Sequence, residues 1–161
     1  MEDLQQVGRS LERQEMINAY KKELAKLLPY LNWLREKQGK LLEKSFTDEG
    51  IGENSIAFPV YDGTLLNFIK ALSATNLMNR NYLYDYRKYR ITDGKGELDY
   101  IERADIKGMG VICSILSKYA IRGRTKGKVW SEGVLNGVYL KAILKLQELV
   151  SRYDTAPLKK F

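Results

Sequence analysis

The sequence contains no histidine and a single cysteine, Cys113. Catalysis by Ser-His-Asp or Cys-His arrangements is therefore excluded, because there is no imidazole to take the proton. Structural zinc sites built from four cysteines, or from two cysteines and two histidines, cannot form, and the chain cannot make an internal disulfide. We expect no metal and no cofactor.

Long apolar runs are also missing. The longest uninterrupted apolar stretches, such as Val111-Ile112-Cys113, have only three residues, whereas a membrane-spanning helix needs about 18. Residues 1–6 are acidic and polar, unlike the basic and then apolar start of a signal peptide. One unpaired cysteine suits a reducing compartment. These features predict a cytoplasmic protein with no membrane contact.

The composition favours one helical domain. The chain has 161 residues, of which 44% are hydrophobic and 29% charged, so it can bury a core and is too short for two ordinary domains. Only three prolines are present, which is few for a sandwich or barrel with many turns. We predict an all-α fold, a single compact domain of five to six helices over residues 1–153, with a loose tail at 154–161.

In the first third of the chain, apolar residues recur at helical spacing over residues 4–28 and again over 30–34. Leu41 and Leu42 could extend the second run past Gly39, so this part predicts one broken helix or two helices. Pro29 should end or kink the first of these helices. Residues 45–56 are polar and contain glycine, which predicts a loop. Residues 56–61 form a short extended piece, because Pro59 disfavours helix for the residue before it.

The next helix should begin at a cap provided by Asp62 or Thr64. Its apolar face is expected to contain Leu65, Leu66, Ile69 and Leu72.

Residues 79–91 fit two secondary structures. Tyr82, Tyr84 and Tyr86 alternate as in a strand, whereas Tyr82, Tyr86 and Tyr89 would share a helix face. The helical pattern on both sides favours a helix. A turn is expected at 92–96, followed by a short acidic helical turn at 97–103.

The last third predicts two helices. One follows Asp105 and ends at Gly123 as its C-terminal cap, with Cys113 buried inside it. The other starts at Thr125 and continues to about residue 153. Within it, Gly133 and Gly137 are four residues apart, which predicts close packing of another helix rather than a ligand groove.

The net charge of +7 is concentrated in two segments. Residues 80–90 carry four cations and one acid, and residues 106–131 carry six cations and no acid. The rest of the chain is slightly acidic. The positive charge therefore belongs to local clusters that could contact an anionic partner.

The second segment contains a glycine-interrupted basic loop that leads into a helix. Cationic side chains next to free backbone N–H groups at a helix start can bind a phosphate. The loop lacks the glycine and lysine spacing of a Walker motif. The alternative is a solvated loop between helices, capped by Gly123. The candidate binding residues are Lys118, Arg122, Arg124, Lys126, Lys128 and Trp130.

The first segment interleaves tyrosines and arginines. Aromatic rings can stack on nucleic-acid bases while guanidinium groups hold phosphates. The alternative is a core stripe of tyrosines whose hydroxyls reach the surface. The candidate binding residues are Tyr82, Tyr86, Arg87 and Arg90. The sequence alone does not place the two clusters on one face.

Three motifs together resemble an uncharacterised bacterial family, a domain of unknown function found mostly in short Firmicute proteins. The motifs are Phe58-Pro-Val-Tyr-Asp62 with Leu65-Leu66-x-Phe68-Ile69-Lys70, then Asn81-Tyr-x-Tyr84, then Ile115-Leu-Ser-Lys-Tyr119 with Gly123-x-Thr-Lys-Gly127-x-x-Trp130. The resemblance covers about residues 24–153 and implies a real domain, often encoded near mobile elements. It implies no activity, cofactor or catalytic residue. Arg124 stands where the family has methionine.

The residues support two hypotheses of different classes. The first is a non-enzymatic binding module whose basic face contacts nucleic acid or a nucleoprotein. The second is a protein-interaction or inhibitor protein of a mobile element, acting against host defence, with exposed tyrosines and the glycine pair as its surface. An acidic protein partner or a homo-oligomer would fit it.

A phosphate- or nucleotide-handling enzyme is a more distant third hypothesis. No pair of acid-base residues has a spacing that singles it out, so we name no catalytic residue.

Overall fold

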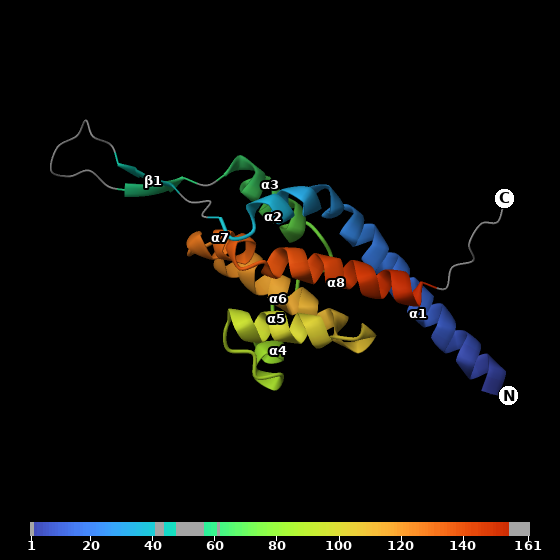
Figure 1. The fold of residues 1–161 in the computed structure, drawn as a ribbon. Helices are drawn as coiled ribbons and strands as arrows, with labels where there is room; N and C mark the ends of the chain where they lie inside the picture. Colours follow the sequence, from blue (N-terminus) through green and yellow to red (C-terminus); the bar gives the residue numbers. More distant parts are fainter. Residues whose placement is uncertain (1, 41–43, 48–56, 61, 155–161) are drawn as a thin grey trace.

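The computed structural model describes residues 2–40, 44–47, 57–60 and 62–154, with side chains described for 11–40 and 62–154. In this part of the chain, eight α-helices pack around one hydrophobic core (Figure 1). The elements, in chain order, are α1 (Glu2–Ala25), the 3₁₀ turn η1 (Leu28–Tyr30), α2 (Leu31–Lys37), β1 (Lys44–Thr47), β2 (Ala57–Val60), α3 (Gly63–Ser73), α4 (Tyr82–Lys88), α5 (Gly94–Arg103), the 3₁₀ turn η3 (Ile106–Gly108), α6 (Met109–Arg122), α7 (Lys128–Leu135) and α8 (Val138–Tyr153).

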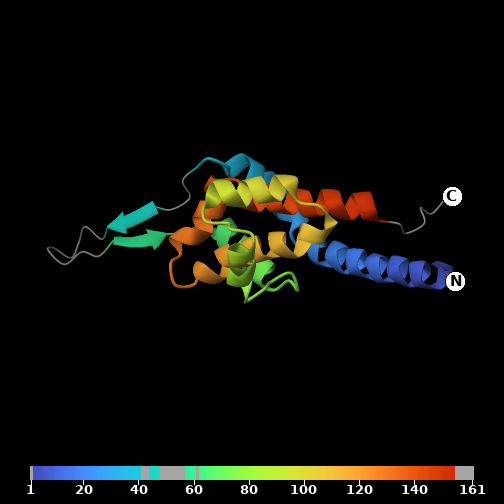
Figure 2. The ribbon, with the colours of Figure 1, turned by 90° about the horizontal axis from the view of Figure 1, so that it is seen from below.

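Helix α6 is the centre of the domain. Ten of its 14 residues are buried, as expected for a helix with neighbours on all sides. It contacts α3, α4, α5, α7 and α8. Figures 1 and 2 show α8 along one side of it, with α4 and α5 on the side away from α2. The predicted all-α class is confirmed, with more helices than the five or six expected.

Helix α3 begins at Asp62, as the sequence predicted. The Asp62 carboxylate accepts hydrogen bonds from the backbone N–H of Thr64 (2.7 Å) and Leu65 (3.3 Å). The expected apolar face is confirmed for Leu65, Ile69 and Leu72. It is wrong for Leu66, which is 42% exposed. One step of about 100° turns Leu66 away from the stripe that its neighbour Leu65 occupies.

The first predicted helix ends before Pro29. Helix α1 stops at Ala25, and Pro29 lies in the first turn of η1, where its missing N–H costs no hydrogen bond. The break foreseen at this proline is therefore confirmed. The amino-terminal half of α1 extends beyond the rest of the domain (Figures 1 and 2).

The long final helix predicted from Thr125 is wrong in two ways. It starts at Lys128, and it is divided into α7 and α8. Gly137 separates the two with a φ of 79°, in the left-handed region that glycine adopts at little cost. The Asn136 side chain accepts a hydrogen bond from the N–H of Val138 (3.0 Å) and caps the new helix start.

The residues at 45–47, expected to be loop, belong to a strand. β1 pairs antiparallel with β2, with Lys44 opposite Val60 and Thr47 opposite Ala57. The extended piece foreseen near 56–61 is confirmed over 57–60. Residues 48–56 of the predicted loop and 155–161 of the predicted tail lie outside the described residues.

The glycine at 94 opens α5 instead of belonging to a separate turn. The helix starts there because the Asp93 carboxylate accepts a hydrogen bond from the N–H of Gly96 (2.8 Å). None of the described helices is both long and apolar enough to cross a membrane.

Candidate functional site

The segment 82–88, for which the sequence favoured helix over strand, is helix α4, and it packs along α6. Polar side chains fix this contact. Ser114 on α6 donates to the carboxylate of Asp85 on α4 (2.6 Å) and accepts from the side-chain amide of Asn79 (3.0 Å). The N–H of Asn79 donates to Ser117 (2.7 Å). Both serines are fully buried, so this network holds α4 in one orientation.

Helix α4 ends in a Schellman motif, a pair of backbone hydrogen bonds that closes a helix C-terminus. The N–H of Ile91 donates to the carbonyl of Tyr86 (2.9 Å), and the N–H of Arg90 donates to that of Arg87 (3.3 Å). The motif requires a left-handed residue, and Arg90 has a φ of 54°. Glycine is usual at this place because it has no Cβ to clash.

A groove of about 590 Å³ lies where the ends of α4 and α6 meet. Helix α4 contributes aromatic, aliphatic and cationic side chains to its lining, and α6 contributes two cations. The lining residues are Tyr82, Leu83, Tyr86, Arg87, Arg90, Ile91, Thr92, Lys118 and Arg122. Its volume is within the usual range for small-molecule sites. The groove therefore brings together cations from the two basic clusters of the sequence.

Three of the groove's cations are exposed: Arg87, Arg90 and Arg122. Within the part of the chain whose side chains are described, their guanidinium groups make no hydrogen bond and no ion pair. Each guanidinium presents a planar set of N–H donors that suits phosphate and carboxylate oxygens. The groove thus has a positive rim that is open to an anionic ligand.

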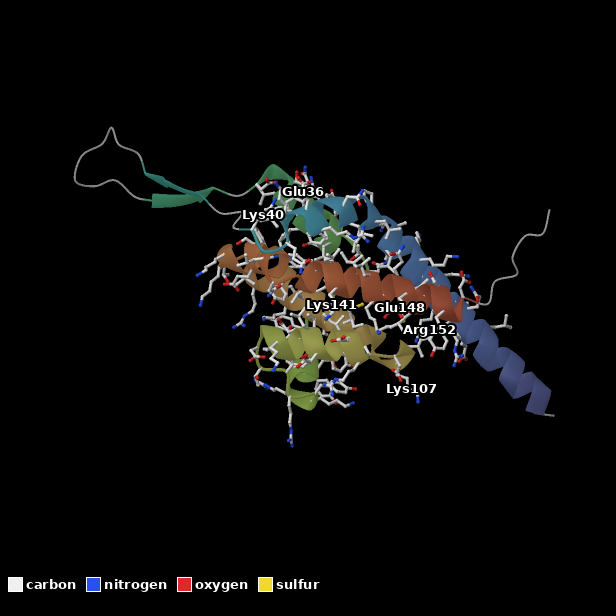
Figure 3. All side chains as sticks on the ribbon, in the orientation of Figure 1. Glu36, Lys40, Lys107, Lys141, Glu148 and Arg152 are labelled. Atoms are coloured by element: carbon white, nitrogen blue, oxygen red, sulfur yellow. The ribbon has the colours of Figure 1, made fainter. Side chains whose placement is uncertain are left out.

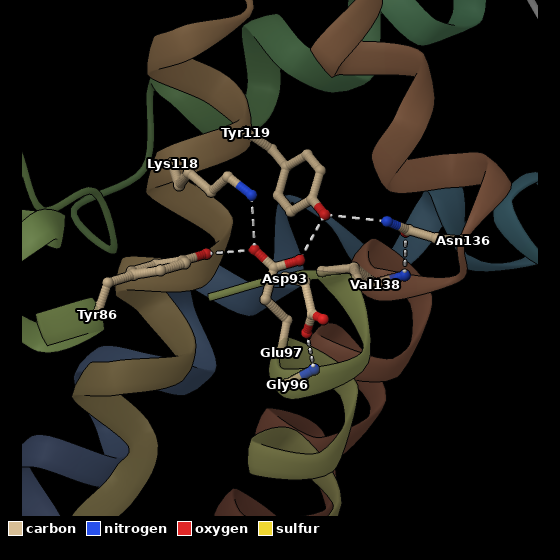
Figure 4. Close-up of polar contacts among 8 residues, drawn as sticks. All are labelled: Tyr86, Asp93, Gly96, Glu97, Lys118, Tyr119, Asn136 and Val138. Carbon is tan, nitrogen blue, oxygen red and sulfur yellow. Dashed lines mark hydrogen bonds and ion pairs between the residues drawn. The ribbon is translucent and has the colours of Figure 1, made fainter. Parts of the chain in front are cut away.

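The fourth cation, Lys118, is paired to a buried carboxylate (Figure 4). Its ammonium group lies 2.8 Å from Oε2 of Glu97, which is fully buried near the start of α5. The same oxygen accepts from the hydroxyl of Tyr86 (2.5 Å), and Oε1 accepts from Tyr119 (2.6 Å). Three donors therefore satisfy a charge that would otherwise be costly to bury. We call Glu97, Lys118, Tyr86 and Tyr119 the Glu97 cluster.

The hydroxyls of this cluster act as donors. Burial, and after it the negative charge of Glu97, raises the pKa of Tyr86 and of Tyr119 well above the ordinary value of 10.0. The Lys118 ammonium also lies over both rings, 4.6 Å from the centre of the Tyr119 ring and 5.5 Å from that of Tyr86. These contacts fix the direction of Lys118 at the groove wall.

Asn136 extends the cluster to the bend between α7 and α8. Its side-chain amide donates to the Tyr119 hydroxyl (2.9 Å). The cluster therefore ties α4, α5, α6 and this bend together. No group of three or more carboxylates or thiols in the described residues is arranged to hold a metal ion.

Of the ten candidate binding residues, the structure brings six into the groove. These are Tyr82, Tyr86, Arg87, Arg90, Lys118 and Arg122. Arg124, Lys126 and Lys128 are exposed in and just after the loop between α6 and α7, outside the groove lining.

Trp130 has a packing role. Its indole N–H donates to the carbonyl of Ala120 (3.0 Å), and its ring covers Gly123 so closely that a methyl group there would overlap it. Gly123 caps α6 as predicted, but with a φ of −63°. This glycine is therefore required by the indole and not by a left-handed backbone.

The glycine pair of the sequence forms no open surface. The Tyr139 ring of α8 lies against Gly133, and the side chain of Gln38 lies against Gly137. Close packing is confirmed at Gly133, although the packed group is a ring from the next helix. As a docking surface for another protein, the pair is already covered.

Sequence reasoning missed Glu97, the residue that organises the site. A signal was present, because Glu97 and Ile101 are four residues apart and Ile101 is apolar, so both face the core. Its three donors come from two other helices, and their convergence is not visible in a linear pattern. Cys113, in contrast, is buried as predicted.

No protein-family model, no curated protein and no solved structure matches this chain. The resemblance to an uncharacterised bacterial family therefore stays a prediction, and the function is inferred from the site alone.

Proposed function

We propose that this protein is a non-enzymatic module that binds nucleic acid through the groove between α4 and α6. The observation that carries the proposal is the meeting of two cation clusters, about 30 residues apart in sequence, over tyrosine rings in one groove. Guanidinium groups bind phosphate oxygens with paired hydrogen bonds, and aromatic rings stack on bases.

Exposed tyrosines on α4 and at its C-terminal cap support single-stranded nucleic acid as the partner. Tyr84 is 59% exposed and Tyr89 is 43% exposed. The ammonium of Lys88 lies 6.0 Å from the centre of the Tyr84 ring and 5.5 Å from that of Tyr89. Rings next to cations outside the core can stack on unpaired bases, which a duplex keeps covered.

The exposed cations of the loop between α6 and α7 would extend the contact. Arg124, Lys126 and Lys128 continue from the groove wall at Arg122 along the chain. A strand bound in the groove could place further phosphates over them. Such contacts add affinity without sequence preference.

The test is the fluorescence anisotropy of a labelled oligothymidine of about 20 nucleotides, titrated with the protein between about 50 and 200 mM salt. We expect binding that weakens steeply with salt, with a logarithmic slope of about −3 if four or five phosphates are neutralised. A labelled duplex of the same length should bind more weakly. Salt-independent binding, or no binding at low salt, would contradict the proposal.

A matched pair of double variants separates the groove from net charge. Arg87→Gln with Arg122→Gln removes two groove cations and should lower affinity at least tenfold. Arg35→Gln with Lys40→Gln removes two exposed cations, one on α2 and one just after it. Helix α2 lies on the side of the domain away from α4 (Figure 1), and Figure 3 labels Lys40 there. Equal losses from both pairs would show that the groove has no special role.

A further inference from the structure

The residue that ends α4 is conformationally unfavourable. A left-handed backbone costs an L-residue such as arginine about 1 kcal/mol or more relative to glycine. Arg90 cannot relax, because the hydrogen bond between Ile91 N–H and the Tyr86 carbonyl closes the Schellman motif around it. Glycine would fulfil the backbone role at Arg90 with less strain.

No hydrogen bond or ion pair of the Arg90 guanidinium to a described residue offsets this cost. The side chain is exposed at the groove. A cation near a helix C-terminus is favoured by the helix dipole, but Arg87 and Lys88 already provide this in the last turn of α4. What distinguishes Arg90 is its place at the groove rim.

The opposite wall of the groove also ends in a cation. Arg122 is the last residue of α6 and lines the groove one helical turn after Lys118. The groove is also lined by the buried Tyr82 and Ile91 and by the half-buried Tyr86. The rings of Tyr82 and Tyr86 lie 6.1 Å apart in an edge-to-face arrangement. An apolar floor with a cationic rim suits a ligand that has one flat apolar part and one anionic part.

Resting on the proposed function, we infer that the groove takes one nucleoside phosphate, and that Arg90 is its phosphate anchor together with Arg122. The base lies on the apolar floor and the phosphate is held at the rim. A groove of about 590 Å³ has the size of a small-molecule site, which a single unpaired nucleotide can enter and a base within a duplex cannot. The nucleotide could be free or part of a strand, since the recognised chemistry is the same.

The decisive variant is Arg90→Gly. It should raise the midpoint of thermal unfolding by about 2–4 °C, because it relieves the left-handed strain. It should also weaken oligothymidine binding about tenfold, because one charge-assisted phosphate contact is lost. A gain in stability together with a loss of affinity is the result expected if Arg90 holds a phosphate from a strained backbone position.

Two further variants serve as controls. Arg90→Asn introduces a residue that tolerates the left-handed region and removes the positive charge. This variant should therefore also bind oligothymidine more weakly. Lys40→Gln removes an exposed cation just after α2, outside the groove lining, and should change affinity less than threefold. If Arg90→Gly stabilises the protein and leaves affinity unchanged, the inference is wrong while the proposed function stands. If the unaltered protein binds no oligothymidine, both are wrong.

Competition identifies the source of the nucleotide. Thymidine monophosphate and inorganic phosphate are titrated against the labelled strand, each with the unaltered protein and with Arg90→Gly. Displacement by the nucleotide, at concentrations where phosphate does not displace, indicates that a free nucleotide enters the groove. Displacement by neither, with affinity for the strand still dependent on Arg90, assigns the site to a nucleotide within a strand. Equal displacement by both would overturn the role of the base.

Discussion

Within the described part of the chain, charged side chains lie on two sides of the α4–α6 pair, and they are paired on the inner side and unpaired on the outer side. On the inner side, the Glu97 carboxylate is fully buried and receives three donors. On the outer side, Arg87, Arg90 and Arg122 are exposed at the groove without a partner among the described residues. The inner charge is neutralised and therefore structural, whereas the outer charge is open to a ligand.

Tyr86 and Lys118 belong to both sides. Their polar ends reach Glu97, while both residues line the groove. The interior thus holds the walls of the groove in place. Substitutions around Glu97 should therefore change mainly the free energy of unfolding, and substitutions at the groove rim should change mainly the affinity for the ligand.

The largest expected effect comes from Glu97→Ala. Removing the carboxylate leaves Lys118 and two tyrosine hydroxyls without their acceptor, so we expect a loss of about 3–5 kcal/mol in the free energy of unfolding, measured by urea denaturation. Glu102→Ala is the control, because that carboxylate is 69% exposed and lies 3.5 Å from Lys141. It should change stability by less than about 0.5 kcal/mol. Similar losses in both variants would contradict the structural role of Glu97.

The interior also contains a close contact that one methyl group would break. Gly133→Ala places a Cβ against the Tyr139 ring and should destabilise the protein by about 2 kcal/mol. Gly110→Ala makes the same change in α6, where no described atom outside the adjacent turns of the helix backbone lies within 4 Å of the new Cβ. It should raise stability by up to about 1 kcal/mol. A gain in both variants, seen in the same urea titrations, would show that the ring can move aside.

Two Tyr→Phe variants compare a buried hydroxyl that is hydrogen-bonded with one that has no partner among the described residues. Tyr119→Phe removes a donor to Glu97 and should cost about 1.5–2 kcal/mol. Tyr139→Phe removes the one fully buried hydroxyl of the described residues that has no hydrogen-bond partner. It should leave stability unchanged or raise it by about 1 kcal/mol. A destabilised Tyr139→Phe would point to a partner for this hydroxyl.

Changes of pH should have the smallest effect on the free energy of unfolding near neutrality, with larger effects only at alkaline and acidic pH. Burial raises the pKa of Cys113 from 9.0 to about 12 and that of Tyr100 from 10.0 to about 12. Because folded-state pKa values above the unfolded ones stabilise the protonated protein, stability should be full below about pH 9 and fall as the pH rises toward 12. A hydrogen bond from Lys26 lowers the pKa of Glu23, so stability should fall as the pH drops below its ordinary 4.5.

Between about pH 5.5 and 8.5 the free energy of unfolding should change by less than about 0.5 kcal/mol, because the chain has no histidine to titrate there. Urea denaturation across this range checks the plateau. A stability step within it would require a carboxyl or amine with a strongly displaced pKa.

Local chemistry allowed much of the fold to be predicted. The Asp62 cap depends only on its own neighbours. The tyrosine spacing of residues 82–88 fits a strand as well as a helix, and the helical pattern on both sides correctly favoured the helix. The bend at Gly137 was missed because a glycine four residues after another also fits close helix packing. β1 was missed because Lys44–Thr47 forms a strand only through its pairing with β2.

The site could be predicted in part only. Charge counting selects both basic clusters, because composition is a local property. It cannot show that Arg90 and Arg122 face one groove, since this depends on how α4 packs on α6. The basic loop of the sequence also ended at Trp130, whose indole covers Gly123 in the structure.

Amide chemical shifts report residue by residue whether the groove between α4 and α6 is the binding surface. The isotope-labelled protein is titrated with unlabelled oligothymidine at low salt. We predict shift changes concentrated at residues 82–92 and 118–122, with smaller changes at 124–128 and none at Arg35 or Lys40. Changes centred on α1 or α8, or no changes at all, would contradict this role of the groove.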